Sequence, residues 1–309
     1  MKRFVTKRLL MSVLTLWVII TITFFMMHSI PGNPFAKEGR MPQSVYENLQ
    51  AKYGLDKPLG EQYVIYLKNV LKGDLGESMK SKTETVNDMI GRGAPISFRI
   101  GLQAFVFSII IGPTLGSIAA LYQNKWPDYL TMILALIGIS VPSFVFASLL
   151  IQFVAMKVAW IPISWGDGWV HTLLPTLSIA LMPTASSARL MRSSMLEVLG
   201  QDYIKTAKSK GIARLGVIMK HAVRNAILPI VSSMGTTLSG LLTGSFVIEK
   251  IFGIPGLGNF FVTSINNRDY TLIMGTTIFY SVVLIILLLV VDILYVLIDP
   301  RIKLSGGDN

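Results

Sequence analysis

Residues 188–229 read ARLMRSSMLEVLGQDYIKTAKSKGIARLGVIMKHAVRNAILP, and this stretch decides how the rest of the chain is organised. It is the longest polar interruption in the C-terminal two-thirds of the chain, and long apolar segments flank it. Only two acids, Glu197 and Asp202, oppose its basic residues, which are Arg189, Arg192, Lys205, Lys208, Lys210, Arg214, Lys220 and Arg224. A basic connection between apolar segments is typical of a loop on the cytoplasmic side of a membrane.

The composition of the whole chain agrees with a membrane protein. The 309 residues are 52% hydrophobic and 15% charged, whereas soluble domains have roughly 45–50% and about 25%. The net charge of +11 is explained by basic loops and does not require nucleic acid as a partner. Because the chain has no cysteine, disulfides, thiolate catalysis and Cys-ligated metals are excluded. We therefore expect an all-α polytopic membrane protein.

The apolar pattern predicts six transmembrane helices, because a span needs about 20 apolar residues. They cover residues 9–29, 98–122, 129–159, 173–190, 228–248 and 271–298. Residues 1–8 carry four basic side chains and no acid, which predicts a cytoplasmic N-terminus. A cleaved signal peptide is the alternative for the first span, but its apolar core is usually shorter.

The polar segment 30–97 is predicted to lie outside, since its nine basic residues nearly balance eight acids. Residues 45–53 and 62–71 within it have a helical pattern, and Gly and Pro separate them. We expect a small exterior cap. With six spans, residues 189–227 form a cytoplasmic loop and residues 300–309 a cytoplasmic tail.

Proline and glycine interrupt several predicted spans. Pro113, Pro142 and Pro183 free backbone groups that need partners in the bundle or in water. One such proline is ordinary in a membrane helix, but three favour a moving bundle that lines a pathway. Gly112 and Gly116 form a small-xxx-small pair that lets another helix approach closely.

Several kinds of chemistry are missing from the sequence. No P-loop occurs, so the chain should not hydrolyse ATP. The three histidines, His28, His171 and His221, are too scattered for a metalloprotease helix. Ser140 lies within a span, but no span after it carries a histidine base for a serine protease. We predict no catalytic residue and no metal site.

Asp292 is the one acid that lies well inside a predicted span. Such residues are candidates for proton relays. Asp299 and Arg301 follow within two helical turns, however, which favours a structural role near the cytoplasmic edge. A proton-coupled carrier would also be expected to show inverted repeats, and none is evident.

The basic stretch itself predicts a helical hairpin. One helix is expected from about Ala188 to Lys210, ending at Gly211, which accepts a left-handed conformation. A second helix is expected from about Arg214 to Leu228. Narrow apolar faces with basic flanks suit either a lipid surface or a groove in a partner protein. A lipid surface has no need of a glycine-hinged hairpin between two spans, so a partner is favoured.

The hairpin resembles the cytoplasmic EAA loop of the permease subunits of binding-protein-dependent ABC importers. The matching residues are Ala207, Gly211, Leu228 and Pro229. The departures are a longer spacing from glycine to proline and the residues Lys205, Thr206 and Ala226. These departures are similar to the peptide and nickel branch of the family. Other stretches resemble the first membrane subunit of oligopeptide importers, namely PGNPF, YGLDKPLGEQYVIYL, KGDLGES, GISVPSF, FVIEKIFGIPGLGNF, NNRDYTLIMG and VDILYVLIDPRI.

The resemblance implies a type I ABC importer permease fold over residues 94–299 in a bacterial cell membrane. It further implies a second permease, two ATPase subunits that hold ATP and Mg²⁺, and an extracytoplasmic peptide-binding protein. This chain would then bind no cofactor itself. Alternating access would be coupled to the ATPases through residues 203–211, with contributions from Tyr203, Ile204, Lys205, Thr206, Ala207, Lys208, Gly211, Leu228 and Pro229.

For the path of the peptide, the small hydroxyl residues of the fifth span offer a weakly selective, wet surface. They are Thr236, Thr237, Ser239, Thr243 and Ser245. The alternative is that these residues only pack helices. Oligopeptides are the expected substrate, with dipeptides, nickel or another small ligand as the alternative and a stand-alone secondary carrier as a distant one.

Overall fold

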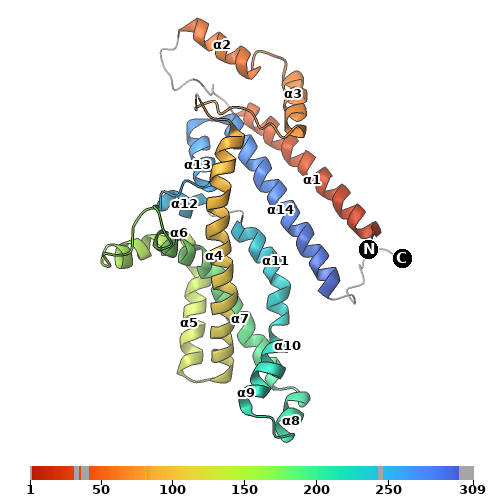
Figure 1. Ribbon diagram of the computed structural model, residues 1–309, viewed down its shortest axis with the longest axis vertical. Coiled ribbons are helices and arrows are strands. Elements are labelled where there is room, and N and C mark those ends of the chain that lie inside the picture. Colours follow the sequence, from red (N-terminus) through yellow and green to blue (C-terminus); the bar gives the residue numbers. More distant parts are fainter. Residues whose placement is uncertain (1, 31–34, 36–41, 82, 243–245, 299–309) are drawn as a thin grey trace. The chain divides into compact units, whose positions relative to one another are not determined.

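The structure is a computed structural model that describes residues 2–30, 35, 42–81, 83–242 and 246–298 (Figure 1). The α-helices are α1 (Lys2–Ser29), α2 (Gln43–Tyr53), α3 (Leu59–Leu71), α4 (Val86–Leu121), α5 (Trp126–Ser140), α6 (Ser143–Leu150), α7 (Leu173–Leu199), α8 (Asp202–Ser209), α9 (Arg214–Gly216), α10 (Arg224–Ala226), α11 (Leu228–Leu242), α12 (Phe246–Ile251), α13 (Leu257–Asn267) and α14 (Tyr270–Ile298). Three short segments are η1 (Ile151–Ala155) and η3 (Val217–Val223), both π-helical, and η2 (Val170–Thr172), a 3₁₀ turn. Within these described ranges, the only β-pairing is an isolated bridge between Glu77 and Thr85.

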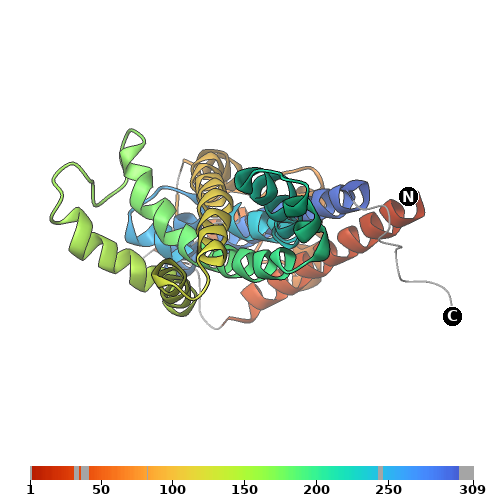
Figure 2. The same cartoon turned by 90° about the horizontal axis from the view of Figure 1, so that it is seen from below.

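The chain divides into two compact units. The first comprises residues 1–95 and 255–286, and the second comprises residues 96–254 and 287–309. In the first unit, α1 lies alongside the first part of α14, and α2 and α3 are joined by a short turn (Figures 1 and 2). α2 and α3 confirm the helical pattern predicted within the segment 30–97. Each begins after a proline in an extended conformation, Pro42 and Pro58.

A small apolar core joins the distant parts of the first unit. It contains Phe35, Met79, Tyr270 and Ile273, with side chains of α1 and α2 packed around them. Residues from the N-terminal third and from α14 therefore bury one another, although about 190 residues separate them in sequence. This core fixes the predicted exterior segment on the start of α14.

α4 differs from the span predicted at residues 98–122 because it begins at Val86. Its 36 residues run without a break through Gly112 and Pro113. At about 1.5 Å per residue the helix is roughly 54 Å long, whereas the hydrocarbon core is about 30 Å thick. α4 is therefore long enough to extend beyond the membrane.

The span predicted at residues 129–159 is not one helix. α5 ends at Ser140, and the pair α5 with α6–η1 is bent by 110°. Val141 and Pro142 have extended backbones (ψ 122° and 139°), because proline disfavours a helical conformation of the preceding residue. Figure 2 shows α5 nearly end-on and α6 extending sideways from it. The predicted interruption at Pro142 is thus confirmed as a sharp turn.

By length and composition, four helical stretches of the described chain can cross a membrane. They are Thr6–Ser29, Val86–Leu121, Leu228–Ile251 and Tyr270–Val291. The bent pair Trp126–Ser140 and Ser143–Ala155 is a fifth candidate. The remaining predicted span, 173–190, lies in α7, which is 27 residues long but contains prolines, hydroxyl residues and Arg189. The chain is an all-α multi-pass protein, and the count of six spans stays a prediction.

Candidate functional site

The middle of the basic stretch is a short helix, α8, with two distinct faces. Ile204 is fully buried and Ala207 is 5% exposed. Both belong to an apolar cluster with Met191 and Met195 of α7 and with the η3 segment. The side chains on the other face are exposed, namely those of Tyr203, Lys205, Thr206 and Lys208. α8 is therefore anchored on one side and open to a partner on the other.

The hairpin is more segmented than the sequence predicts. The helix expected over residues 188–210 is two helices, because the chain leaves helical geometry between α7 and α8. Gln201 has an extended backbone there (φ −74°, ψ 149°). The second expected helix, over residues 214–228, consists of α9, the π-helical η3 and α10. The prediction of a single helix fails at Gly200. Glycine weakens a helix, but its presence in the sequence does not show in which direction the chain turns.

The predicted helix stop at Gly211 is confirmed. Its φ is +74°, in the left-handed region that costs other residues roughly 1–2 kcal/mol. Its N–H donates to the carbonyl of Lys208 at 3.0 Å. Leu228 and Pro229 are exposed at the start of α11. Proline fits there because a first-turn N–H has no partner within the helix.

Asp128 and Arg192 form a bidentate ion pair that joins α5 to α7. Nε of Arg192 lies 2.5 Å from Oδ1 of Asp128, and Nη2 lies 2.7 Å from Oδ2. Asp128 is 2% exposed. Its Oδ2 also accepts a hydrogen bond from the backbone N–H of Asn124, at 3.0 Å. Sequence reasoning counted Arg192 as a loop charge and missed the pair, because 64 residues separate its members.

The hydroxyl residues proposed for the peptide path are spread over different environments. Thr236 is exposed, Thr237 half-buried and Ser239 1% exposed. Each donates a hydrogen bond to a backbone carbonyl of α11, at 2.9 Å. Thr243 and Ser245 lie outside the described residues. Their role as a path stays a prediction.

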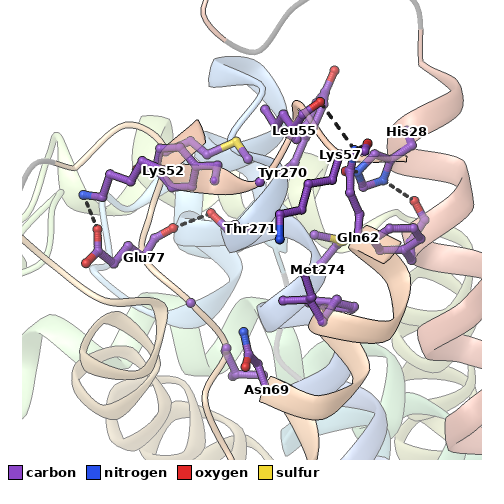
Figure 3. Close-up of a pocket in the computed structure, with 18 of the residues that line it drawn as sticks. His28, Lys52, Leu55, Lys57, Gln62, Asn69, Glu77, Tyr270, Thr271 and Met274 are labelled. Carbon is purple, nitrogen blue, oxygen red and sulfur yellow. Dashed lines mark hydrogen bonds and ion pairs between the residues drawn. The ribbon is translucent and has the colours of Figure 1, made fainter. Parts of the chain in front are cut away.

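A cavity of about 430 Å³ lies in the first unit, between the end of α1, the α2–α3 turn and the start of α14 (Figure 3). Lys52 at its rim pairs with Glu77 at 2.5 Å, and Lys57 pairs with Glu61 at 2.9 Å. The hydrogen bond to Glu77 raises the pKa of Lys52. His28 contacts the Phe24 carbonyl and Gln62. Both lysines that line the cavity therefore pair with acids of the same chain. This pairing indicates that the cavity lies at a structural junction between these elements.

Asp269 ties residues 78–79 to the start of α14. The carboxylate is buried and accepts hydrogen bonds from the Ser78 hydroxyl and from the backbone N–H groups of Met79 and Leu272. The hydroxyl of Thr271 lies 3.0 Å from Oδ1 of Asp269 and donates at 2.7 Å to the carbonyl of Glu77 (Figure 3). The motif NNRDYTLIMG carries this residue, but the sequence does not show that its partners come from residues 78–79.

Glu249 of α12 is a third buried acid and lies, like Asp128, in the second unit. It is 1% exposed and accepts a hydrogen bond from the Ser97 hydroxyl at 2.7 Å. Its sequence neighbour Ile248 belongs to an apolar cluster that also contains Ile100 and Phe252. No group of His, Asp and Glu able to hold a metal ion occurs in the part of the chain that the structure describes.

Comparison with known families gives two matches that together cover most of the chain. Residues 112–304 match the binding-protein-dependent transport system inner membrane component. Residues 1–92 match the N-terminal membrane component of the same systems. In a solved structure, an amino acid ABC transporter with histidines, one chain superposes with a TM-score of 0.53 at 14% identity. The match covers 67% of this chain and 93% of that chain, and it supports the fold.

Curated relatives are similar over nearly the full length. The dipeptide transport system permease protein of Bacillus subtilis is 51% identical, covering 98% of this chain and 99% of the relative. The oligopeptide transport system permease proteins of Haemophilus influenzae and Escherichia coli K12 are each 43% identical, covering 98% of this chain and 100% of each relative. The chain therefore belongs to the family of inner membrane components of binding-protein-dependent transport systems.

Proposed function

We propose that the chain is a permease subunit of an ATP-driven importer of peptides. The observation that carries this proposal is α8, a short helix anchored to α7 through Ile204 and Ala207 while its basic face stays open. A surface of this kind suits docking of a partner that delivers mechanical work. The peptide substrate is proposed because the similar proteins are permeases of dipeptide and oligopeptide transport systems.

As a permease the chain is not an enzyme, and ATP hydrolysis belongs to separate subunits. In the proposed complex it pairs with a second permease, two ATPase subunits that hold ATP and Mg²⁺, and a peptide-binding protein on the outer side. Closure of the ATPase dimer displaces α8, and the spans alternate between inward- and outward-open states. Two sites and two global states satisfy the requirement for energetic coupling.

Oligopeptides are the proposed substrate, and dipeptides are the second candidate because the 51%-identical relative is a dipeptide permease. Reconstitution of the complex in proteoliposomes, with labelled peptides of increasing length, decides between them. We expect ATP-dependent uptake that requires the binding protein. Uptake without ATPase subunits would instead indicate a secondary carrier, and uptake restricted to dipeptides would replace the oligopeptide proposal.

Cysteine accessibility tests the proposed path along α11, since the native chain has no thiol. We expect a hydrophilic maleimide to label Thr236→Cys, which is exposed, and transported peptide to protect it. Ser239→Cys is the matched control, because Ser239 is buried. Labelling of Thr236→Cys only by lipid-soluble reagents would exclude this surface as a wet path.

A further inference from the structure

The Asp128–Arg192 ion pair lies where α5 meets the part of α7 that leads to α8. The aspartate is 2% exposed and the arginine side chain 25% exposed. Both carboxylate oxygens are engaged by the guanidinium, and Oδ2 also holds the N–H of Asn124 in the α4–α5 turn. One carboxylate therefore fixes both the position of α7 and the turn that precedes α5.

Close packing extends this connection along α7. A side chain at Gly112 of α4 would meet the Thr184 carbonyl at 2.7 Å, and one at Gly116 would meet the Ala188 carbonyl. On α5, a side chain at Gly138 would lie 2.8 Å from Cβ of Ala185. α4 and α5 thus approach α7 so closely that only glycine fits at these positions. The predicted close approach at Gly112 and Gly116 is confirmed.

The C-terminal part of α7, which carries Arg192, is also joined to α8 by apolar contacts. Met191 and Met195 are buried in the same cluster as Ile204 and Ala207. Met191 directly precedes Arg192 in sequence. The anchor of α8 and the ion pair are therefore adjacent on α7, within about one helical turn.

From this arrangement we infer that Asp128 and Arg192 are positioning residues that fasten α5 to the arm bearing α8, so that a displacement of α8 carries α5 with it. The inference rests on the proposed function of α8. A buried ion pair adds little stability compared with an apolar contact of similar size, because desolvation of the charges opposes their attraction. Its bidentate geometry does specify one relative position of the two helices.

The far end of α5 fits this role. At Val141 and Pro142 the helix is interrupted and the chain turns by 110°. Because no helical hydrogen bonds hold α5 and α6 in line there, α5 is able to reorient relative to α6. The turn is where the transmitted motion of α5 ends.

A double-mutant cycle in the complete reconstituted complex tests the inference. The variants are Asp128→Asn, Arg192→Gln and their combination, and the readouts are complex assembly, ATP turnover and peptide uptake per ATP. We expect each single change to lower uptake per ATP by roughly 2- to 30-fold, the range for loss of one coupling contact. The double variant should lose no more uptake per ATP than the more impaired of the two single variants.

The matched control is the exposed pair Lys57–Glu61 of the first unit, changed to Lys57→Gln and Glu61→Gln. These changes should leave uptake per ATP unaltered. Assembled Asp128 and Arg192 variants with normal uptake per ATP, or losses that simply add in the double variant, would overturn the inference. A wild-type complex that imports no peptide would instead contradict the proposed function.

A second measurement tests the inference even if the Asp128→Asn and Arg192→Gln variants assemble poorly. Asp128→Cys with Arg192→Cys, joined by a short bifunctional thiol reagent in a cysteine-free complex, replaces the ion pair by a covalent link. We expect the linked complex to recover wild-type uptake per ATP and the unlinked one to stay impaired. A linked complex that hydrolyses ATP without importing peptide would show that α5 and α7 must separate, and it would refute the inference.

Discussion

At the scale of residues, α8 places neighbouring side chains on opposite faces. Ala207 is buried in the cluster under the helix, whereas Thr206 is exposed. We expect Ala207→Glu to destabilise the hairpin by about 3 kcal/mol or more, because it buries a charge without a partner. Thr206→Glu should change stability by less than about 0.5 kcal/mol but weaken binding of the ATPase subunits. Size-exclusion profiles and ATPase co-purification measure the two effects.

The two variants form a matched pair, since the same carboxylate is added one position apart. Normal folding of Ala207→Glu would mean that α8 does not pack on α7 as the structure has it. Full ATPase binding by Thr206→Glu would remove the exposed face of α8 as the docking surface. Each outcome contradicts a different part of the proposal.

Tyr53 gives a pH-dependent test in the first unit. Burial raises the pKa of its hydroxyl above the ordinary 10.0, and the hydroxyl donates to the Ser78 carbonyl at 3.0 Å. Because the folded pKa is raised, the stabilising contribution is complete below the unfolded pKa and is lost as pH rises through the folded pKa. We expect α2 to become more susceptible to protease above pH 10 in the native protein.

Tyr53→Phe is the control for that titration. Phenylalanine cannot donate the hydrogen bond to Ser78, which costs about 0.5–1.5 kcal/mol of stability at neutral pH. It also has no hydroxyl that could ionise in alkali. The variant should therefore be more susceptible at neutral pH and show a smaller further change in alkali. An identical alkaline transition in both proteins would assign the pH dependence to another group.

At the scale of elements, the Asp269 carboxylate connects residues 78–79 to α14, because it accepts hydrogen bonds from Ser78, Met79 and Leu272. We expect Asp269→Asn to loosen this connection more than Ser78→Ala does. The asparagine loses the negative charge and replaces the oxygen that accepts the Ser78 hydroxyl by a donor, whereas the alanine removes a single hydroxyl. Limited proteolysis between residues 72 and 85 measures the difference. Equal cleavage of the two variants would show that the carboxylate has no special role.

Elements with strong local signals could be predicted from the sequence. α2 and α3 follow Pro42 and Pro58, and the Pro142 break follows from the chemistry of proline. The π-helical η3 and the split between α7 and α8 could not be predicted, because packing under α8 selects them. Ion pairs such as Asp128–Arg192 can be identified only once the fold is known, since helical periodicity carries no information about a partner 64 residues away.

For the whole molecule, the chain alone should neither bind nor turn over ATP. It lacks a P-loop, and its family assigns hydrolysis to other subunits. We expect the purified permease to give no phosphate release, and addition of the ATPase subunits to give turnover that binding protein and peptide stimulate. Turnover by the permease alone, after removal of contaminating ATPases, would contradict the assignment.

Composition and charge sufficed to predict the class of the molecule, because a lipid environment leaves a strong signal in apolar runs. They did not reveal that the N-terminal third and the start of α14 share one core, in which Met79 and Tyr270 belong to the same apolar cluster. The hydroxyl residues of α11 form one group in the sequence, although Ser239 is buried and Thr236 is exposed in the structure. Burial depends on neighbours that a linear pattern does not specify.

The sharp turn after α5 has a consequence for the lipid around the protein. α5 has 15 residues, or about 22 Å of helix, which is shorter than a hydrocarbon core of about 30 Å. Most of its exposed side chains are apolar, among them Leu130, Ile133, Leu134, Leu136 and Ile137. The bilayer beside α5 must thin, or the sideways α6 must fill the difference, each at a modest cost per ångström of mismatch. Transport by this permease should therefore depend on acyl-chain length and be fastest in thinner bilayers.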